Sequence, residues 1–225
     1  MKKSKNLVLL PGLDGTGKLF TPLIKELDSS IMIQTISYDT QKKQTYDELV
    51  EYVLEKLPKD DFVLVAESFS GFIAYQIGLK KLKNLKHIIL VATFLKNPNP
   101  LLLNLLPGSF VFLLPIPKLI IKKFFLGSSS DDKTIDLFQK SVKSISNKLL
   151  DFRLKQIKTL NSANQKLTIP TTYIQAKDDQ LVLKNSLDDF KKVCDDLTIY
   201  QVEGKHFILQ SNPKKCANII ESILQ

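Results

Sequence analysis

The chain has 225 residues, of which 44% are hydrophobic and 24% are charged, and its formal net charge is +9 at pH 7. This length is sufficient for one domain with a large core, and the composition is ordinary for a globular protein. The positive charge is almost all lysine, scattered along the chain, with Arg153 the only arginine and no tryptophan. Nucleic-acid partners are therefore disfavoured, because they are bound mainly through arginine forks and aromatic stacking.

Cysteine usage and the N-terminus bear on cofactors and location. Cys194 and Cys216 show none of the spacings typical of metal or redox sites, so we expect a reducing compartment, no metal and no cofactor. The apolar run at residues 7–10 is too short for a signal peptide, which predicts a cytoplasmic protein. Residues 97–117 are uncharged, but their prolines would break a spanning helix, so no transmembrane segment is expected.

The hydrophobic pattern alternates between strand and helix along most of the chain. Strands are predicted at residues 6–10, 31–36, 62–65, 86–92, 171–176 and 197–202, and helices at 18–27, 46–57, from 72 onward, at 187–193 and at 207–223. Such alternation with short connections is typical of a parallel sheet with helices on both faces. The predicted fold is therefore α/β, with a mostly parallel sheet of about six strands.

The alternation breaks at residues 94–161. We expect this segment to form an inserted helical cap with helical pieces at 119–126, 135–144 and 149–160, above a core made of residues 1–93 and 162–225. An apolar cap over a cleft favours an acyl substrate. The same leucines would equally serve to pack the cap onto the core, and both interpretations stay open.

Residues 61–71 contain a candidate nucleophile. A buried strand at 62–65 ends at small and polar residues, and a helical pattern begins a few residues later. A serine at such a strand-to-helix corner is typical of the nucleophile elbow, which makes Ser68 the candidate. The usual Gly-x-Ser-x-Gly pattern is altered, since Ala66 and Ser70 replace the glycines and Gly71 follows one position later. The competing interpretation is that Ser68 only caps the helix.

A serine nucleophile needs a base, and the base needs a carboxylate to fix its tautomer. The chain has only two histidines. His206 follows the last predicted strand, at the carboxyl edge of the sheet where sites of open α/β folds lie. His87 begins a strand at the opposite edge and is interpreted as a structural residue. Asp178 and Asp179 follow the preceding strand, so serine, aspartate and histidine each lie just after a strand of one parallel sheet.

A glycine-rich loop at residues 11–17 follows the first strand. Its glycine spacing fits neither a phosphate-binding loop nor a dinucleotide fingerprint. The remaining interpretation is a loop that offers a backbone N–H to an oxyanion.

Four segments together resemble the α/β-hydrolase superfamily, and within it the small serine esterases with a Leu-Pro-Gly-Leu/Met-Asp-Gly-Thr-Gly loop. They are residues 10–17, 66–71, 176–182 and 203–207, and the resemblance extends over nearly the whole chain outside the cap. It implies a Ser68, His206 and Asp179 triad, with Asp178 one position early, and an oxyanion hole formed by the N–H groups of Leu13 and Phe69. Because Asn6 begins directly at the strand before the oxyanion loop, we do not expect the family's two antiparallel opening strands here.

The resemblance implies a serine hydrolase that cleaves a carboxylic ester or thioester of an apolar acyl substrate through an acyl-enzyme. An acyltransferase, or an esterase for methyl esters on an acyl carrier, would use the same triad, and the lysine-rich surface suggests an acidic acyl carrier protein as partner. The alternative from another class is a non-catalytic protein that binds a ligand on the hydrolase scaffold. The altered glycines around Ser68 favour that alternative, whereas the complete Ser-Asp-His set disfavours it.

Overall fold

The computed structural model describes residues 6–105, 116–128, 130–161 and 163–224. They form one six-stranded sheet of order β2-β1-β3-β4-β5-β6, in which every neighbouring pair is parallel. Its strands are β1 (Asn6–Leu10), β2 (Met32–Thr35), β3 (Phe62–Glu67), β4 (Leu85–Val91), β5 (Thr171–Ala176) and β6 (Leu197–Val202). The α/β prediction is confirmed, and within the described residues the sheet is entirely rather than mostly parallel.

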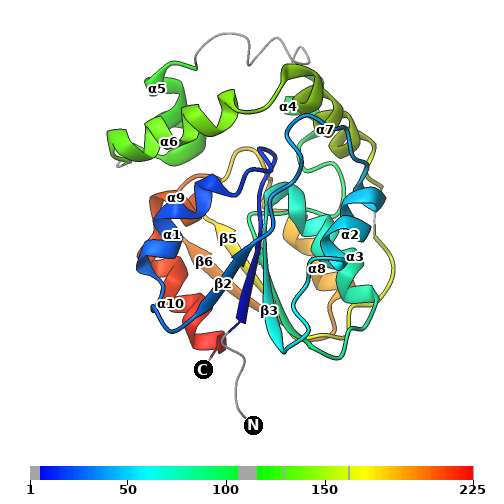
Figure 1. The fold of residues 1–225 in the computed structure, drawn as a ribbon. Helices are drawn as coiled ribbons and strands as arrows, with labels where there is room; N and C mark the ends of the chain where they lie inside the picture. The colour runs from blue at the N-terminus through cyan, green and yellow to red at the C-terminus, as the bar shows by residue number, and fades with distance from the viewer. Residues whose placement is uncertain (1–5, 106–115, 129, 162, 225) are drawn as a thin grey trace.

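Helices cover both faces of the sheet (Figure 1). One face carries α1 (Thr21–Glu26), α9 (Ile208–Ser211) and α10 (Pro213–Leu224), and the other carries α2 (Tyr46–Leu54), α3 (Gly71–Leu79) and α8 (Ser186–Val193). Side chains alternate along each strand, so in β1 Leu7 and Leu9 join the α1 side of the core while Val8 and Leu10 join the α2 side. Both faces are apolar for this reason. The helix expected at residues 18–27 begins as a 3₁₀ turn, η1 (Lys18–Phe20).

The described helices of the long β4–β5 connection, residues 92–170, lie across the carboxyl edge of the sheet (Figure 1). Its helical pieces are α4 (Pro100–Leu105), α5 (Lys118–Ile121), the π-helical turn η4 (Lys122–Leu126), α6 (Asp132–Lys143) and α7 (Asn147–Thr159). Side chains of Asp131 and Ser146 accept backbone N–H groups at the starts of α6 and α7. The three predicted helical pieces are present, while residues 106–115 of the expected cap lie outside the described part of the chain.

Among the helices of the described residues, none has the length and apolar character needed to span a bilayer. Within the same residues, His, Cys, Asp and Glu side chains form no group of three that could ligate a metal ion. Both cysteines are buried and free.

Candidate active site

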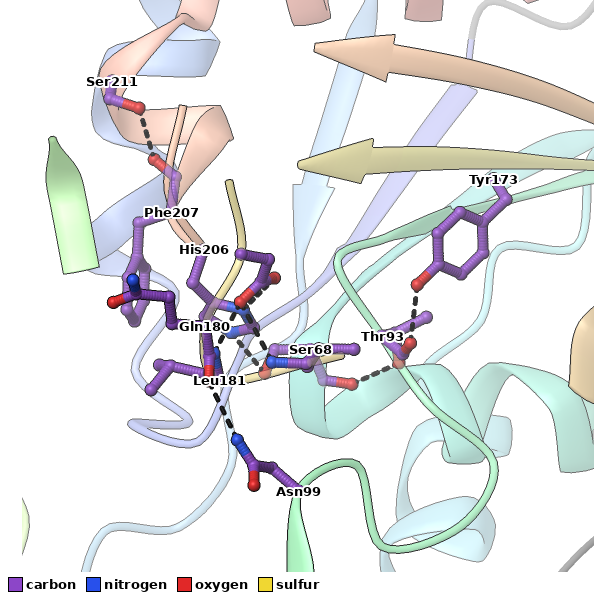
Figure 2. A network of polar contacts seen from close by, with 11 residues as sticks. Ser68, Thr93, Asn99, Tyr173, Gln180, Leu181, His206, Phe207 and Ser211 are labelled. Carbon is purple, nitrogen blue, oxygen red and sulfur yellow. Dashed lines mark hydrogen bonds and ion pairs between the residues drawn. The ribbon is translucent and has the colours of Figure 1, made fainter. Parts of the chain in front are cut away.

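The structure brings Ser68, Asp179 and His206 together at the carboxyl edge of the sheet. Each lies just after a strand. Ser68 follows β3 directly, Asp179 follows β5 within a few residues, and His206 follows β6 within a few residues. The Nε2 atom of His206 lies 2.9 Å from Ser68 Oγ (Figure 2). Its Nδ1 atom lies 2.8 Å from Asp179 Oδ2. The imidazole therefore has the serine hydroxyl on one side and a carboxylate on the other, which is the geometry that activates a serine.

Ser68 has the backbone conformation of a tight corner. Its φ of 50° is left-handed, which is uncommon for a residue with a side chain, and a 3₁₀ turn, η2 (Ser68–Ser70), leads from it into α3. Thr93 Oγ1 donates to the carbonyl of Ser68, and the Tyr173 hydroxyl donates to the carbonyl of Thr93 over 2.7 Å (Figure 2). A Cβ on Gly71 would lie 1.8 Å from Thr93 Oγ1. The glycine is therefore needed at position 71, where Thr93 approaches the helix.

Ser70 is more than a small residue in place of glycine. It is fully buried, and its hydroxyl donates to the carbonyl of Pro11. The hydroxyl of Tyr38 also forms a hydrogen bond with Ser70 Oγ. The hydroxyl thus ties the corner at Ser68 to the glycine-rich loop. The altered elbow pattern has a structural explanation, because a glycine at position 70 could make neither contact.

We predict that Ser70→Gly, which restores the common elbow pattern, destabilises the protein by about 1–3 kcal/mol, because it leaves two buried polar groups without partners. Urea unfolding of the purified variant measures this loss. Tyr38→Phe removes only one of the two contacts and is the matched comparison, with a smaller expected loss. A Ser70→Gly protein as stable as wild type would show that these bonds contribute nothing.

Asp179 is oriented by its own loop. Its Oδ1 accepts the N–H groups of Leu181 and Val182, each over 2.9 Å, which leaves Oδ2 for His206. Asp178 is exposed, and its N–H donates to the carbonyl of Gly204. The structure therefore places Asp179 and not Asp178 beside the histidine.

His87 lies away from this site. It pairs with Val63 near the start of β3, and its Nε2 atom lies 2.9 Å from Thr172 Oγ1. Ser68 lies beyond the opposite end of the same strand. The structure thus agrees with the interpretation of His87 as a structural residue.

The charge state of His206 depends on its surroundings. Burial lowers the pKa of its imidazole, but the adjacent Asp179 carboxylate, its hydrogen bond and the nearby Glu67 outweigh this, so the pKa lies above the ordinary 6.5. His206 is only 3% exposed. A histidine must be neutral to accept a proton, so His206 could act as a base only above the raised pKa.

Glu67, directly before Ser68, is a buried carboxyl that the sequence analysis did not single out. It is 1% exposed, and burial raises its pKa to about 7 despite a hydrogen bond from Gln210. Gln210 Nε2 donates to Oε1 over 3.0 Å, while Oε2 has no partner among the described residues. The sequence feature that could have indicated this carboxyl is a charged residue at the end of an otherwise apolar strand.

The glycine-rich loop lies directly against Ser68. A Cβ on Gly12 would lie 3.8 Å from the Cβ of Ser68, so Leu13 comes next to the serine. Within the described residues, no hydrogen bond uses the Leu13 N–H. Phe69 lies at the start of η2, where N–H groups have no partner inside the helix. Both amides expected from the sequence are thus adjacent to Ser68.

Two different environments flank the site. Phe207, next to His206, packs with Phe125 and Phe138 of the β4–β5 connection at ring distances of 5.1–6.2 Å. Beside the glycine-rich loop is a polar cavity of about 650 Å³ whose walls do not include Ser68. It is lined by Thr16, Lys18, Ser37, Tyr38, Asp39, Thr40, Lys42, Gln44, Tyr52 and Ser144. The surroundings of the site are therefore apolar next to His206 and polar next to the glycine-rich loop.

A family model described as serine aminopeptidase, S33 (Hydrolase_4) matches residues 44–206, well over half of the chain. This range includes Ser68, Asp179 and His206. A search among curated proteins found no match.

Several solved structures share the fold. A lipase-esterase related protein from Clostridium acetobutylicum has a TM-score of 0.79 at 22% identity, covering 99% of this chain and 96% of that one. MenH from S. aureus has a TM-score of 0.75 at 15% identity, with 99% and 94% covered. The type II thioesterase BorB from the borrelidin biosynthetic cluster has a TM-score of 0.72 at 15% identity, with 98% and 92% covered. These likenesses show the α/β-hydrolase fold, and the match to the family model shows that the chain belongs to the S33 family of α/β hydrolases.

Proposed function

We propose that the protein is a serine hydrolase that cleaves a carboxylic ester or thioester of an apolar acyl substrate, with Ser68, His206 and Asp179 as its catalytic triad. The observation that carries the proposal is the continuous hydrogen-bonded chain from Ser68 Oγ through both ring nitrogens of His206 to Asp179 Oδ2. All three side chains are buried or nearly so, which strengthens their mutual interactions. A helix-capping serine would not need this arrangement.

The proposed reaction proceeds through an acyl-enzyme. Ser68 Oγ attacks the acyl carbonyl carbon while its proton passes to His206 Nε2, and Asp179 stabilises the imidazolium that forms. The N–H groups of Leu13 and Phe69 bind the oxyanion of the tetrahedral intermediate. His206 then returns the proton to the departing alcohol or thiol. Water then attacks the acyl carbonyl while His206 takes one of its protons, and the imidazolium returns this proton to Ser68 Oγ as the acid is released.

The β4–β5 connection supports an apolar acyl group as substrate. Its η4 and α6 place Phe125 and Phe138 against Phe207, directly beside the histidine. We propose that residues 94–161 act as a lid over the core formed by residues 1–93 and 162–225. Ser68 is 9% exposed, so its side chain is largely covered by the surrounding protein.

The proposal is tested with a fluorophosphonate probe, which reacts only with activated serines. We expect wild-type protein to be labelled at Ser68, as located by peptide mass, and to hydrolyse p-nitrophenyl butyrate. His206→Ala should lose both properties, because the serine then has no base. His87→Ala is the matched control and should keep them. Hydrolysis at the wild-type rate by Ser68→Ala, or labelling at another serine, would refute the assignment.

An esterase or acyltransferase acting on an acyl carrier is a second candidate, because the net charge of +9 complements an acidic protein. If it is correct, cleavage of an acyl-carrier ester should weaken with added salt while cleavage of the free ester stays constant. If the cleavage of both substrates depends equally on salt, an acidic acyl carrier protein is excluded as the partner. A folded protein that the fluorophosphonate does not label would favour the non-catalytic ligand-binding alternative.

A further inference from the structure

Arg153, the only arginine of the chain, is buried in α7 with 1% of its surface exposed. No carboxylate of the described residues lies within ion-pair distance of its guanidinium. Removing a cation from water without a paired anion is costly, so other polar groups must compensate for the loss.

The compensation comes from two loops at the carboxyl edge of the sheet. Nη1 of Arg153 donates to the carbonyl of Leu13 over 2.8 Å, and Nη2 donates to the carbonyl of Asp39 over 3.1 Å. Gly15 leaves the space for this approach, since a Cβ there would lie 2.5 Å from Nη1. The φ of Gly15 is +71°, which also favours glycine. The glycine-rich loop is thus shaped around the guanidinium.

The same guanidinium lies against the side chain of Phe69, whose backbone amide is the second proposed oxyanion donor. Its central carbon is 5.8 Å from the ring centroid of Phe69 and 5.8 Å from that of Tyr38. Leu13, whose carbonyl Arg153 holds, supplies the other proposed amide. The turn around Leu13 is closed by a bond from Gly15 N–H to the carbonyl of Gly12 over 3.0 Å. The Leu13 N–H lies in the same peptide plane as that Gly12 carbonyl, and Arg153 holds the next plane through the Leu13 carbonyl, so hydrogen bonds fix both peptide planes of Leu13.

A second helix of the β4–β5 connection holds the same loop. Ser141 of α6 is fully buried, and its hydroxyl donates to Asp14 Oδ2 over 3.1 Å. The loop that follows β1 is thus bonded to α6 and α7, more than 120 residues away in the sequence.

We propose that Arg153 is a positioning residue of the oxyanion hole, which from α7 of the β4–β5 connection holds the loop that carries the Leu13 amide. The inference rests on the proposed function. It assigns to the connection a part in catalysis besides covering the site, because the hole is complete only while α7 is in place.

The test compares Arg153→Met and Arg153→Lys with Lys155→Met, which removes an exposed cation from the same helix. Arg153→Met should lower kcat for p-nitrophenyl butyrate by about 10–100-fold with KM changed less than about 2-fold, as expected for loss of an interaction made mainly in the transition state. Arg153→Lys should recover part of kcat, because an ammonium keeps the charge without the fork of donors. Lys155→Met should match wild type.

Affinity for phenylboronic acid separates positioning from a structural role. Its serine adduct carries a tetrahedral anionic centre, so its affinity should fall in parallel with kcat across the Arg153 variants. Wild-type kcat in Arg153→Met, a change confined to KM, or unchanged boronate affinity would overturn the inference. If circular dichroism shows that Arg153→Met is unfolded, the Lys variant decides: wild-type kcat and boronate affinity there would overturn it. A wild-type protein that neither hydrolyses esters nor reacts with fluorophosphonate refutes the proposed function itself.

Discussion

Replacing Asp179 by asparagine is expected to lower kcat for ester hydrolysis by about 10³–10⁴-fold while the protein stays folded. In the proposed mechanism the carboxylate, 2.8 Å from Nδ1 of His206, accepts the Nδ1–H and so leaves Nε2 free to take the proton of Ser68. An amide at this position can present its NH₂ group to the ring, which favours the opposite tautomer. A p-nitrophenyl ester assay measures the effect, on variant protein that circular dichroism shows to be folded.

The neighbouring aspartate provides a matched control. Asp178 is exposed and contributes only its backbone N–H to the contact with Gly204, so Asp178→Asn should keep kcat close to the wild-type value. An equal loss in both variants would mean that the loop as a whole, and not the carboxylate on His206, is responsible. An Asp179→Asn protein of normal activity would exclude Asp179 from the triad.

Glu67→Gln is expected to change how stability depends on pH. Burial raises the pKa of Glu67 from an ordinary 4.5 to about 7 in the folded protein, so the folded state binds its proton more tightly than the unfolded state. Stability associated with this carboxyl is therefore full below pH 4.5 and declines as the pH rises through about 7. Because one pKa unit corresponds to about 1.4 kcal/mol, the glutamine variant should gain roughly 2–3 kcal/mol relative to wild type between pH 5 and pH 8.

Urea unfolding at both pH values measures this gain, with Glu51→Gln as the surface control. Glu51 is exposed and pairs with Lys80 at the surface, so its replacement should alter stability equally at pH 5 and pH 8. A Glu67→Gln protein whose difference from wild type does not vary with pH would show that Glu67 titrates normally.

The same variant should shift the pH profile of activity. The charge of Glu67 is one of the groups that raise the pKa of His206, so its removal should move the acid limb of kcat/KM to lower pH. The direction is diagnostic, because loss of an unrelated carboxylate would leave this limb in place.

The sheet and the position of the site were predictable from the sequence for a simple reason. Each strand is a short apolar run, and in a parallel sheet the residues after such runs meet at one edge. Ser68, Asp179 and His206 each have this placement, so their proximity followed from the strand assignments. The choice of Asp179 over Asp178 came from the family resemblance, and the structure gives its physical basis in the two N–H groups of Leu181 and Val182.

The supporting contacts were not predictable in this way. Ser70 looked like an imperfect glycine because its partners, Pro11 and Tyr38, are distant in sequence and unrelated to any local pattern. Arg153 sits in a helix whose periodicity indicates only which face is buried, and its contact with Leu13 spans 140 residues. Such bonds depend on how the connection packs on the sheet, and no repeat or spacing in the chain encodes that packing.

The β4–β5 connection is hydrogen-bonded to three loops of the site, which carry the proposed oxyanion donor Leu13, the acid Asp179 and the base His206. Arg153 bonds to the loop of Leu13, Asn99 donates to the carbonyl of Gln180 beside Asp179, and the N–H of Phe207, next to His206, donates to the carbonyl of Phe125 (Figure 2 shows Asn99 and Gln180). Proteins open in cooperative parts, and short helices outside the central sheet are among the first to open. We therefore expect heat or mild denaturant to release these helices first, so that activity by the proposed mechanism is lost by local unfolding while the six strands are still folded. Resistance to heat inactivation is then set by the contacts of these helices and not by the size of the core.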